Sequence, residues 1–288
     1  MTSVELAIFG GSGLYQMDGL DDVERLQLET PFGSPSDDII VGTLHGRQVA
    51  FLPRHGRGHV LTPSEVPYRA NIFAMKTLGV KYIVSVSACG SLREDYEPGH
   101  VVIPDQLFDF TRHRESSFFG EGLVAHASVA DPFSDELSVT LAGAVRDAGG
   151  TVHEGGTFIT IEGPRFSSKG ESHTYRQWGM SIIGMTTSPE AFLAAEAEIA
   201  YSVMAHVTDY DVWHESEEPV TVEAVIRTLQ KNTTLAQDAI SRLVQGMASW
   251  EGDFRAHHGL RDAIITGVDH IPAETREKLA PLVDKYLS

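Results

Sequence analysis

The sequence has few of the features that mark secreted or membrane proteins. It contains a single cysteine, Cys89, so no disulfide can form within the chain. No run of about 18 consecutive apolar residues is present, and such a run is what a membrane-spanning helix needs. The first residues lack the basic segment that opens a secretory signal peptide. These absences favour a cytoplasmic protein without a membrane partner.

Positive charge is also scarce. The chain has 22 Lys and Arg against 40 Asp and Glu, which gives a formal net charge of −18 at pH 7. Such a balance repels nucleic acids and anionic membrane surfaces, so we expect neither as a partner. In a chain this acidic, a local group of cations is a candidate binding site for a small anion.

The order of apolar segments predicts the fold class. The 288 residues can bury a full core, and β-rich segments alternate with helical ones without an internal repeat or a clear linker. This alternation predicts a single α/β domain over residues 1–288, with a mixed, mainly parallel central sheet flanked by helices. Expected strands are 4–9, 23–29, 38–44, 47–52, 81–86, 100–103, 158–161, 180–185 and 201–208; expected helices are 68–78, 134–148, an alanine-rich one from 189, 220–247 and 273–287.

Two aspartates follow the last expected strand. Residues 204–215 read MAHVTDYDVWHE, so an apolar strand ends in Asp209 and Asp211. Alternation places both carboxyls on the same side of an extended chain, where they can reach one planar ligand. Buried carboxylates are costly without partners or a chemical role, and ligands of open α/β sheets bind beyond the strand ends. The alternative interpretation is a loop with ordinary turn-forming aspartates.

Two further segments suit an anion. Residues 54–59 read RHGRGH and are the densest group of cations, a pattern that fits a phosphate or carboxylate site rather than a flexible solvated loop. Residues 10–13, GGSG, form a tight turn that matches neither the dinucleotide fingerprint nor a P-loop. His55 and His59 lack the helical H-E-x-x-H setting, so we expect no metal. Cys89 lies among small residues without a positioned base, and we interpret it as a buried filler rather than a nucleophile.

Seven segments, taken in order, resemble one family. The segments GGSGLY, TPFGSPSD, RHGRGH, SACGSLRED, GTFITIEGPRFSS, GMTTSPEA and TDYDVWHE resemble the purine nucleoside phosphorylases of the trimeric branch, over residues 6–243. Within that branch the chain is most similar to members that cleave S-methyl-5'-thioadenosine. The resemblance implies that phosphate attacks C1' of this nucleoside and releases adenine and 5-methylthioribose 1-phosphate, in purine and methionine salvage. Phosphate is then a co-substrate, and no cofactor is implied.

The resemblance also implies roles for individual residues. Asp209 and Asp211 match the pair that contacts the purine, and a carboxylic acid at N7 can protonate the leaving base as the glycosidic bond breaks. We assign that proton to Asp209, with a pKa raised by burial and by the neighbouring carboxylate, and the N6 amino hydrogens to Asp211. The implied phosphate site is Ser12, Arg54, His55, Ser87, the Ala88 backbone N–H and Thr186. Met185 matches a residue under the ribose, and Phe166 one that faces the base.

Other positions bear on substrate choice. The 6-oxopurine members carry Asn and Glu where this chain has Asp209 and Ser167, so the chain favours a 6-aminopurine. Val222 and Ile226 match an apolar wall that suits a methylthio group at the 5' end. His126 matches a residue that reaches into the neighbouring subunit, which implies a homotrimer or a dimer of trimers. We expect the tail, residues 246–288, to form a helical cover over the 5' pocket.

Departures from the family leave alternatives open. Ser12 and Ser87 replace threonines of the best-known methylthioadenosine-cleaving members. Those members have Asn where this chain has Gly184, and in this respect the chain resembles the 6-oxopurine branch. The first alternative is therefore a 6-oxopurine nucleoside phosphorylase acting on inosine, guanosine or methylthioinosine. The second is a non-catalytic nucleoside- or anion-binding protein. The third is a nucleoside hydrolase, which needs a water-activating group or metal that the sequence does not offer.

Overall fold

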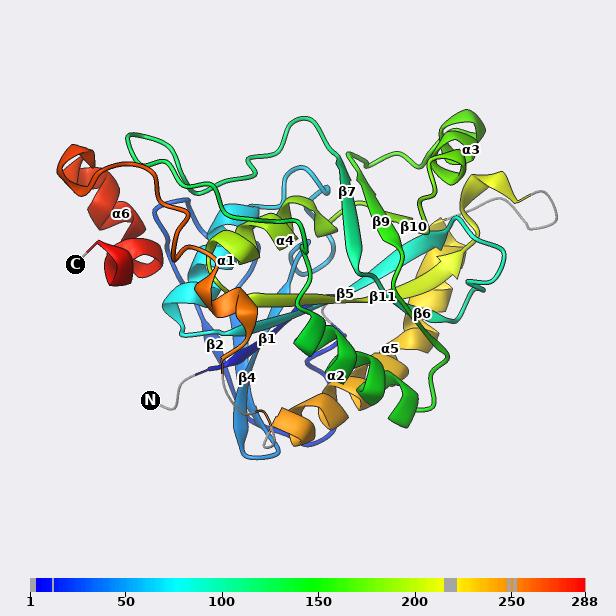
Figure 1. The fold of residues 1–288 in the computed structure, drawn as a ribbon. Helices are drawn as coiled ribbons and strands as arrows, with labels where there is room; N and C mark the ends of the chain where they lie inside the picture. The colour runs from blue at the N-terminus through cyan, green and yellow to red at the C-terminus, as the bar shows by residue number, and fades with distance from the viewer. Residues whose placement is uncertain (1–3, 12, 215–221, 248–249, 251–252, 288) are drawn as a thin grey trace.

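The computed structural model describes residues 4–11, 13–214, 222–247, 250 and 253–287, with only the backbone of 222–231. Within these ranges eleven strands form one mixed sheet covered by helices (Figure 1). The strands are β1 Leu6–Gly10, β2 Leu20–Leu26, β3 Ile39–Leu44, β4 Arg47–Pro53, β5 Tyr82–Ser91, β6 Val101–Ile103, β7 Gln106–Phe110, β8 Val152–Glu154, β9 Thr157–Ile161, β10 Ile182–Gly184 and β11 Ala200–Asp209. The helices are α1 Tyr68–Thr77, α2 Asp135–Asp147, α3 Lys169–Gln177, α4 Thr187–Glu196, α5 Val222–Gly246 and α6 Ala273–Val283.

Most strand pairs are parallel, which confirms the predicted fold class. Six pairs are parallel and four are antiparallel. Strand β5 is the hub: it pairs in parallel with β1 and β11, and near its end in antiparallel with β10. Because β10 runs back along β5, the residues that follow β10 return toward the middle of β5. The sheet therefore brings the ends of β10 and β11 to different points of one central strand.

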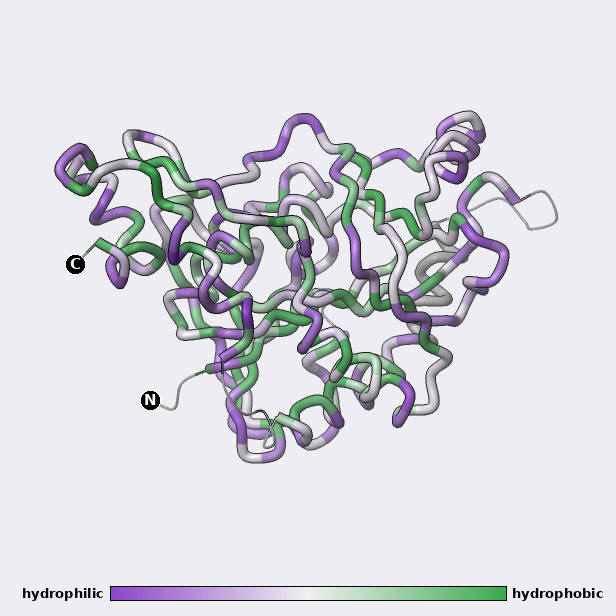
Figure 2. Tube along the Cα trace, viewed as in Figure 1, coloured by the Kyte–Doolittle hydropathy of each residue, from purple (hydrophilic) through white to green (hydrophobic). Residues whose placement is uncertain are grey.

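The core lies on both faces of the sheet. Along β1, Ala7 and Phe9 pack into the cluster that includes α1, α4 and α6, whereas Leu6 and Ile8 pack into the cluster that includes α2 and α5. A strand buried on both faces reads as a continuous apolar run, which is why β1 and β11 were visible in the sequence. Figure 2 shows these strands as hydrophobic and most of the outer loops as hydrophilic.

Three elements were not predicted. Strand β8 has three residues, and β7, at the edge of the sheet, has exposed positions and no clean alternation. Helix α3 is polar and buries only Ser172 and Tyr175, so it carries no apolar periodicity. Its one sequence signal is the capping box in which the Ser168 and Glu171 side chains each bond the other residue's backbone N–H.

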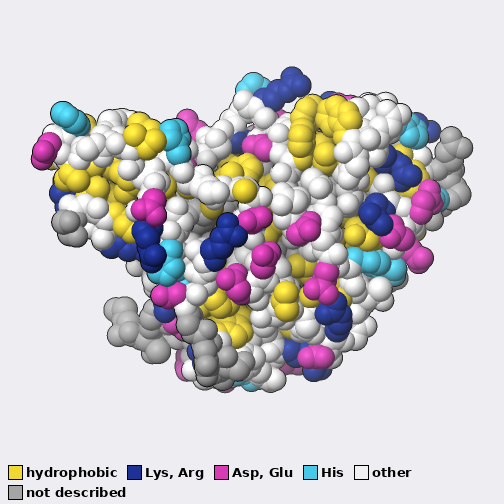
Figure 3. All heavy atoms as spheres, in the orientation of Figure 1, with side chains coloured by type: hydrophobic (Ala, Val, Ile, Leu, Met, Phe, Trp, Pro, Cys, Tyr) yellow, Lys and Arg dark blue, Asp and Glu magenta, His cyan; other side chains and the backbone are white. Residues whose placement is uncertain are grey.

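Several boundaries also differ from the predictions. The strand expected at 81–86 continues to Ser91, because its small residues pair with β11 and β10 instead of opening a loop. The helix expected to reach residue 287 ends at Val283, and a short 3₁₀ turn, Asp284–Tyr286, follows it. Among the described residues, no helix combines the length and the hydrophobicity that a membrane span requires. On the face shown in Figure 3, acidic and basic side chains lie interspersed rather than in separate fields.

The tail, residues 246–288, packs against α1 and against the residues at the start of β11 in the part of the chain that the structure describes. Leu279 and Leu282 of α6 are buried in the same cluster as α1, and the Leu260 backbone N–H donates to the Glu198 carboxylate just before β11. Residues 263–265 run beside residues 124–126 through backbone hydrogen bonds and one isolated bridge. Figure 1 shows α6 at one end of the molecule and α3 at the other. Within one chain, the tail therefore lies at the beginning of β11, whereas Asp209 ends it.

Candidate active site

Asp209 and Asp211 lie close together, but a turn brings them there. Strand β11 ends at Asp209, and Asp211 opens a 3₁₀ turn with a positive φ of 51°. The Asp211 backbone N–H donates to Asp209 Oδ1 at 2.8 Å, and the Thr208 hydroxyl donates to Asp209 Oδ2 at 2.6 Å. The expectation that strand alternation places both carboxyls on one side is therefore wrong. The chain leaves the extended conformation between them.

Burial raises the pKa of both carboxyls. The pKa of Asp209 is raised by burial, against the opposing effect of its two hydrogen bonds. The pKa of Asp211 is raised to about 6, first by burial and then by the negative charge of Asp209, while the Ser172 hydroxyl lowers it. Asp211 Oδ2 is buried and forms no hydrogen bond of ordinary geometry among the described residues, although the Ser172 hydroxyl lies close enough to lower the pKa. A buried acceptor of this kind is suited to a ligand donor.

The raised pKa of Asp211 has a consequence for stability. Well below pH 4 both the folded and the unfolded state hold the proton, but between about pH 4 and 6 the unfolded state has lost it while the folded state still holds it, so folding is weakened as the pH rises. Two pKa units correspond to about 3 kcal/mol. We expect Asp211→Asn to raise the free energy of unfolding at pH 8 by up to this amount, with little gain near pH 4. Thermal unfolding of both proteins across this range measures it; an equal gain at both ends contradicts the assignment.

Gly90 makes room for the two aspartates. It pairs with Asp209 and with Ile183, on the two strands that flank the end of β5. A Cβ at position 90 would lie 3.1 Å from Asp209 Oδ1, 3.2 Å from the Asp211 Cβ and 3.0 Å from Ile183 Cγ2. These distances are shorter than ordinary van der Waals contact, so glycine allows the carboxyls to lie directly against the central strand.

Arg54 is buried and already paired with an acid. Its Nε and Nη2 donate to the two carboxylate oxygens of Glu190 at 2.7 and 2.9 Å, and Nη2 also donates to the Ser85 hydroxyl of β5. The Tyr201 hydroxyl donates to the same Glu190 carboxylate at 2.7 Å. The sequence showed Arg54 as a cation for an anion, but its charge is balanced inside the chain. Glu190 was missed because it reads as an ordinary first-turn acid after Pro189.

His55 and two hydroxyls lie near this ion pair. His55 Nδ1 lies 2.9 Å from the Leu61 carbonyl oxygen, which can only accept, so Nδ1 carries the proton. Burial, followed by the charge of Arg54, lowers the pKa of His55 to about 4. The Ser87 hydroxyl is buried without a partner among the described residues, two residues beyond Ser85 on β5. Thr186 is the N-cap residue of α4, yet its side chain makes no capping bond.

The antiparallel return of β10 places Met185 and Thr186. Ile183 pairs with Gly90, and a Cβ at Gly184 would lie 3.5 Å from the Ala88 carbonyl oxygen, so the chain runs back along β5 toward Ser87. The same Cβ would lie only 2.7 Å from Cζ of Phe158. A side chain at position 184 would therefore force the Phe158 ring or the backbone to shift, which gives this departure from the family a packing reason.

A third apolar cluster supports the aspartates from the side. It contains Tyr175, Ile183 and Trp213, with Met185 and Tyr210 packed against it. The loop that enters α3 holds Ser167, whose buried hydroxyl has no partner among the described residues, and Phe166, which is 40% exposed. Burial also raises the pKa of the Cys89 thiol, as suits a filler rather than a nucleophile.

Some predicted site residues lie elsewhere or are not described. His126 lines a cavity of about 480 Å³ together with Tyr201, Arg255 and Arg261, near the start of β11 and away from Asp209. Ser12 lies outside the described residues, as do the side chains of Val222 and Ile226. The structure thus gathers the residues at the ends of β4, β5, β10 and β11, but within one chain it does not bring His126 to them.

The fold and site together define an α/β protein with an enzyme-type site at its strand ends, where buried polar groups have shifted pKa values. The family model of the phosphorylase superfamily matches residues 5–245, and the chain belongs to this family.

The similar proteins named here are all described as methylthioadenosine phosphorylases. The chain is 54% identical to an S-methyl-5'-thioadenosine phosphorylase of Chloroflexus aurantiacus over the whole of both chains, and 52% identical to one of Geobacter sulfurreducens over 98% and 99% of the two chains. A crystal structure of a methylthioadenosine phosphorylase from an antarctic soil metagenomic library matches with a TM-score of 0.94 and 51% identity, over 98% of this chain and 100% of the other. The methylthioadenosine phosphorylase of Schistosoma mansoni, in complex with adenine, matches with a TM-score of 0.82 and 36% identity, over 86% and 93%.

Proposed function

We propose that the protein catalyses the phosphorolysis of S-methyl-5'-thioadenosine to adenine and 5-methylthioribose 1-phosphate, a step of purine and methionine salvage. The observation that carries the proposal is the buried pair Asp209 and Asp211, whose pKa values are both raised. The pair lies against Gly90 of β5, and the same strand carries Ser87, whose buried hydroxyl has no hydrogen-bond partner among the described residues. Relatives about half identical to the chain bear the name of this activity.

The proposed reaction has two sides. On one side, a phosphate oxygen attacks C1', held by Arg54, His55, Ser87, the Ala88 N–H, Thr186 and Ser12. On the other, the C1'–N9 bond breaks, its electron pair enters the purine, and Asp209 gives a proton to N7. A raised pKa keeps this proton available. Each oxygen of Asp209 has one donor from the chain and keeps a second lone-pair position, on which the proton can be carried.

The choice of a 6-aminopurine follows from the same groups. Asp211 Oδ2 is an open acceptor that can take an N6 amino hydrogen, whereas a 6-oxo group offers no hydrogen to it. Ser167 adds a small hydroxyl where a longer acid would be needed to bind a 6-oxopurine. Gly184 is the main argument for a 6-oxopurine enzyme, but the contact with Phe158 accounts for this glycine by packing instead.

The proposal includes a homotrimer in the cytoplasm, or a dimer of such trimers. His126 and the adjoining tail lie at the start of β11, so they serve a 5' pocket only if they reach the site of a neighbouring subunit. Val222 and Ile226 would form the apolar wall of that pocket. Light scattering that returned the mass of a single 31.4 kDa chain would count against the trimer.

The decisive experiment measures adenine release from methylthioadenosine with and without phosphate. We expect release to require phosphate and to yield one 5-methylthioribose 1-phosphate per adenine. Release without phosphate would indicate a hydrolase, and binding without release would indicate a non-catalytic binder. The same assay with methylthioinosine and inosine tests the base, and adenosine tests the 5' group. Faster turnover of either 6-oxopurine would overturn the proposed base preference.

A further inference from the structure

Arg114 is a buried cation whose hydrogen bonds go mainly to backbone. Its side chain is 1% exposed, although it lies in the loop after β7. Nη1 donates to the carbonyl oxygens of Met185 at 2.7 Å and Ser188 at 2.6 Å, and Nη2 donates to the Glu162 carbonyl oxygen at 2.8 Å. Nη1 also lies 3.2 Å from the Tyr68 hydroxyl, and Nε lies 3.3 Å from Glu162 Oε1.

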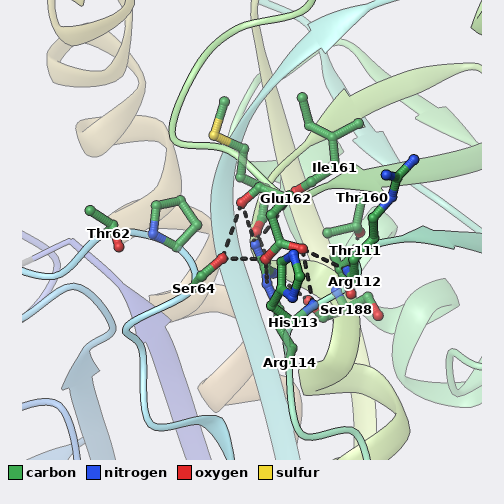
Figure 4. Close-up of polar contacts among 12 residues, drawn as sticks. Thr62, Ser64, Thr111, Arg112, His113, Arg114, Thr160, Ile161, Glu162 and Ser188 are labelled. Atoms are coloured by element: carbon green, nitrogen blue, oxygen red, sulfur yellow. Dashed lines mark hydrogen bonds and ion pairs between the residues drawn. The ribbon is translucent and has the colours of Figure 1, made fainter.

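These acceptors come from segments that are far apart in the sequence. Figure 4 shows Arg114, His113 and Glu162 at the centre of the group, with Ser64 on one side and Arg112 on the other. The Glu162 carboxylate accepts the Ser64 hydroxyl and the backbone N–H groups of Arg112 and His113, so it holds the loop that carries Arg114. The guanidinium thus joins the end of β9, the end of β10, the start of α4 and the start of α1.

The position of two of these bonds is informative. Met185 and Ser188 bracket Thr186, and the same nitrogen, Nη1, binds the carbonyl on each side of it. Thr186 makes no side-chain capping bond of its own to hold it. The positive charge of Arg114 also acts on His55, whose pKa it helps to lower in addition to burial and the charge of Arg54. Arg114 therefore acts on the turn between β10 and α4.

Only arginine fits this set of acceptors. Its planar group carries five N–H donors in a fixed fork, whereas a lysine ammonium has three donors at one point. A lysine could keep the charge next to Glu162, but it could not reach the carbonyls of Met185, Ser188 and Glu162 together. Replacing Arg114 by lysine would therefore keep the positive charge at this position but lose the hydrogen bonds to the three carbonyls.

We propose that Arg114 is a positioning residue that fixes the Met185–Ser188 turn, and so sets where Thr186 meets phosphate and Met185 meets the ribose. This inference rests on the proposed function for the identity of the two ligands. Arg114 itself does not touch the substrate. It acts by holding two carbonyl groups whose residues flank the proposed phosphate contact.

The test uses Arg114→Lys and Arg114→Ala in the full-length protein. For each we expect the KM for phosphate to rise about tenfold or more, with a smaller change in the KM for methylthioadenosine, because a misplaced hydroxyl weakens bonds to a charged ligand. Millimolar guanidinium chloride is expected to restore part of the phosphate affinity to Arg114→Ala by filling the vacated space. Ammonium chloride at the same concentration should not.

The control is Arg93→Ala, which removes an arginine that pairs with Asp95 on the surface. It should leave the phosphate KM unchanged and show no response to guanidinium. A purely structural role of Arg114 predicts a lower active fraction with an unchanged phosphate KM, and that result would overturn the proposal. Calorimetric titration with inorganic phosphate decides the case even if the wild-type protein releases no adenine. A wild-type protein that releases no adenine would refute the proposed function. Unchanged phosphate affinity in both Arg114 variants would refute the role of Arg114.

Discussion

Replacing Asp209 by Asn is expected to lower kcat for adenine release from methylthioadenosine by about 10²- to 10⁴-fold, the usual contribution of a positioned general acid. An amide has the shape of the carboxyl group and can still accept the Asp211 N–H or the Thr208 hydroxyl, but it has no acidic proton to give to N7. The loss should therefore appear in kcat more than in KM. Steady-state kinetics at saturating phosphate measure it.

Two comparisons make this prediction specific. Asp95→Asn removes an exposed carboxylate paired with Arg93 and should leave kcat unchanged. With methylthioinosine as substrate, Asp209→Asn should lose less activity, because an amide can donate to N7 and accept at the 6-oxo edge in the manner of the related 6-oxopurine enzymes. An unchanged kcat on methylthioadenosine would refute the role of Asp209 as the acid.

The second large effect is expected at the ion pair of Arg54 and Glu190. Both side chains are buried, with exposures of 3% and 0%. Arg54→Met would leave the Glu190 carboxylate without its cation in the interior, which typically destabilises a protein by about 3 to 5 kcal/mol. It would also remove a proposed ligand of phosphate. We therefore expect a strongly lowered midpoint of thermal unfolding together with a raised KM for phosphate.

The double variant Arg54→Met/Glu190→Gln separates the two effects. With no unpaired charge left, much of the stability should return, and the side-chain amide oxygen introduced at position 190 can still accept the Tyr201 hydroxyl. The phosphate KM should remain high, because the guanidinium is still missing. Recovery of both stability and phosphate affinity in the double variant would show that Arg54 serves only to balance Glu190.

Part of the site could be read from local sequence because it follows directly from strands. The apolar runs of β1 and β11 are buried on both faces, and the polar residues that follow β4, β10 and β11 mark where ligands bind in α/β sheets. Asp209 and Arg54 were found in this way, whereas Thr186 was assigned to the site only by the family resemblance. Family resemblance added the chemistry, and similar proteins of the same length support it.

Other parts depend on contacts that no local pattern records. Glu190 meets Arg54 across 136 positions, and Arg114 meets Met185 across 71, so neither pairing leaves a mark in the spacing of nearby residues. From the sequence alone, Gly184 suggests a different base preference. The structure shows that a side chain at this position would meet the ring of Phe158. The raised pKa of Asp211 likewise depends on burial by α3 and the sheet, which are separated in the chain.

The sequence by itself determined the fold class, the strand ends that carry polar groups and the class of reaction, because hydrophobic periodicity and short ordered motifs are local properties. Only the tertiary structure decided which charges are balanced and which hydroxyls stay unpaired. It also showed that a turn, not strand alternation, joins Asp209 to Asp211 and that one guanidinium holds the turn around Thr186. These features arise where distant segments meet, since burial and hydrogen bonding are set by neighbours in space rather than in sequence.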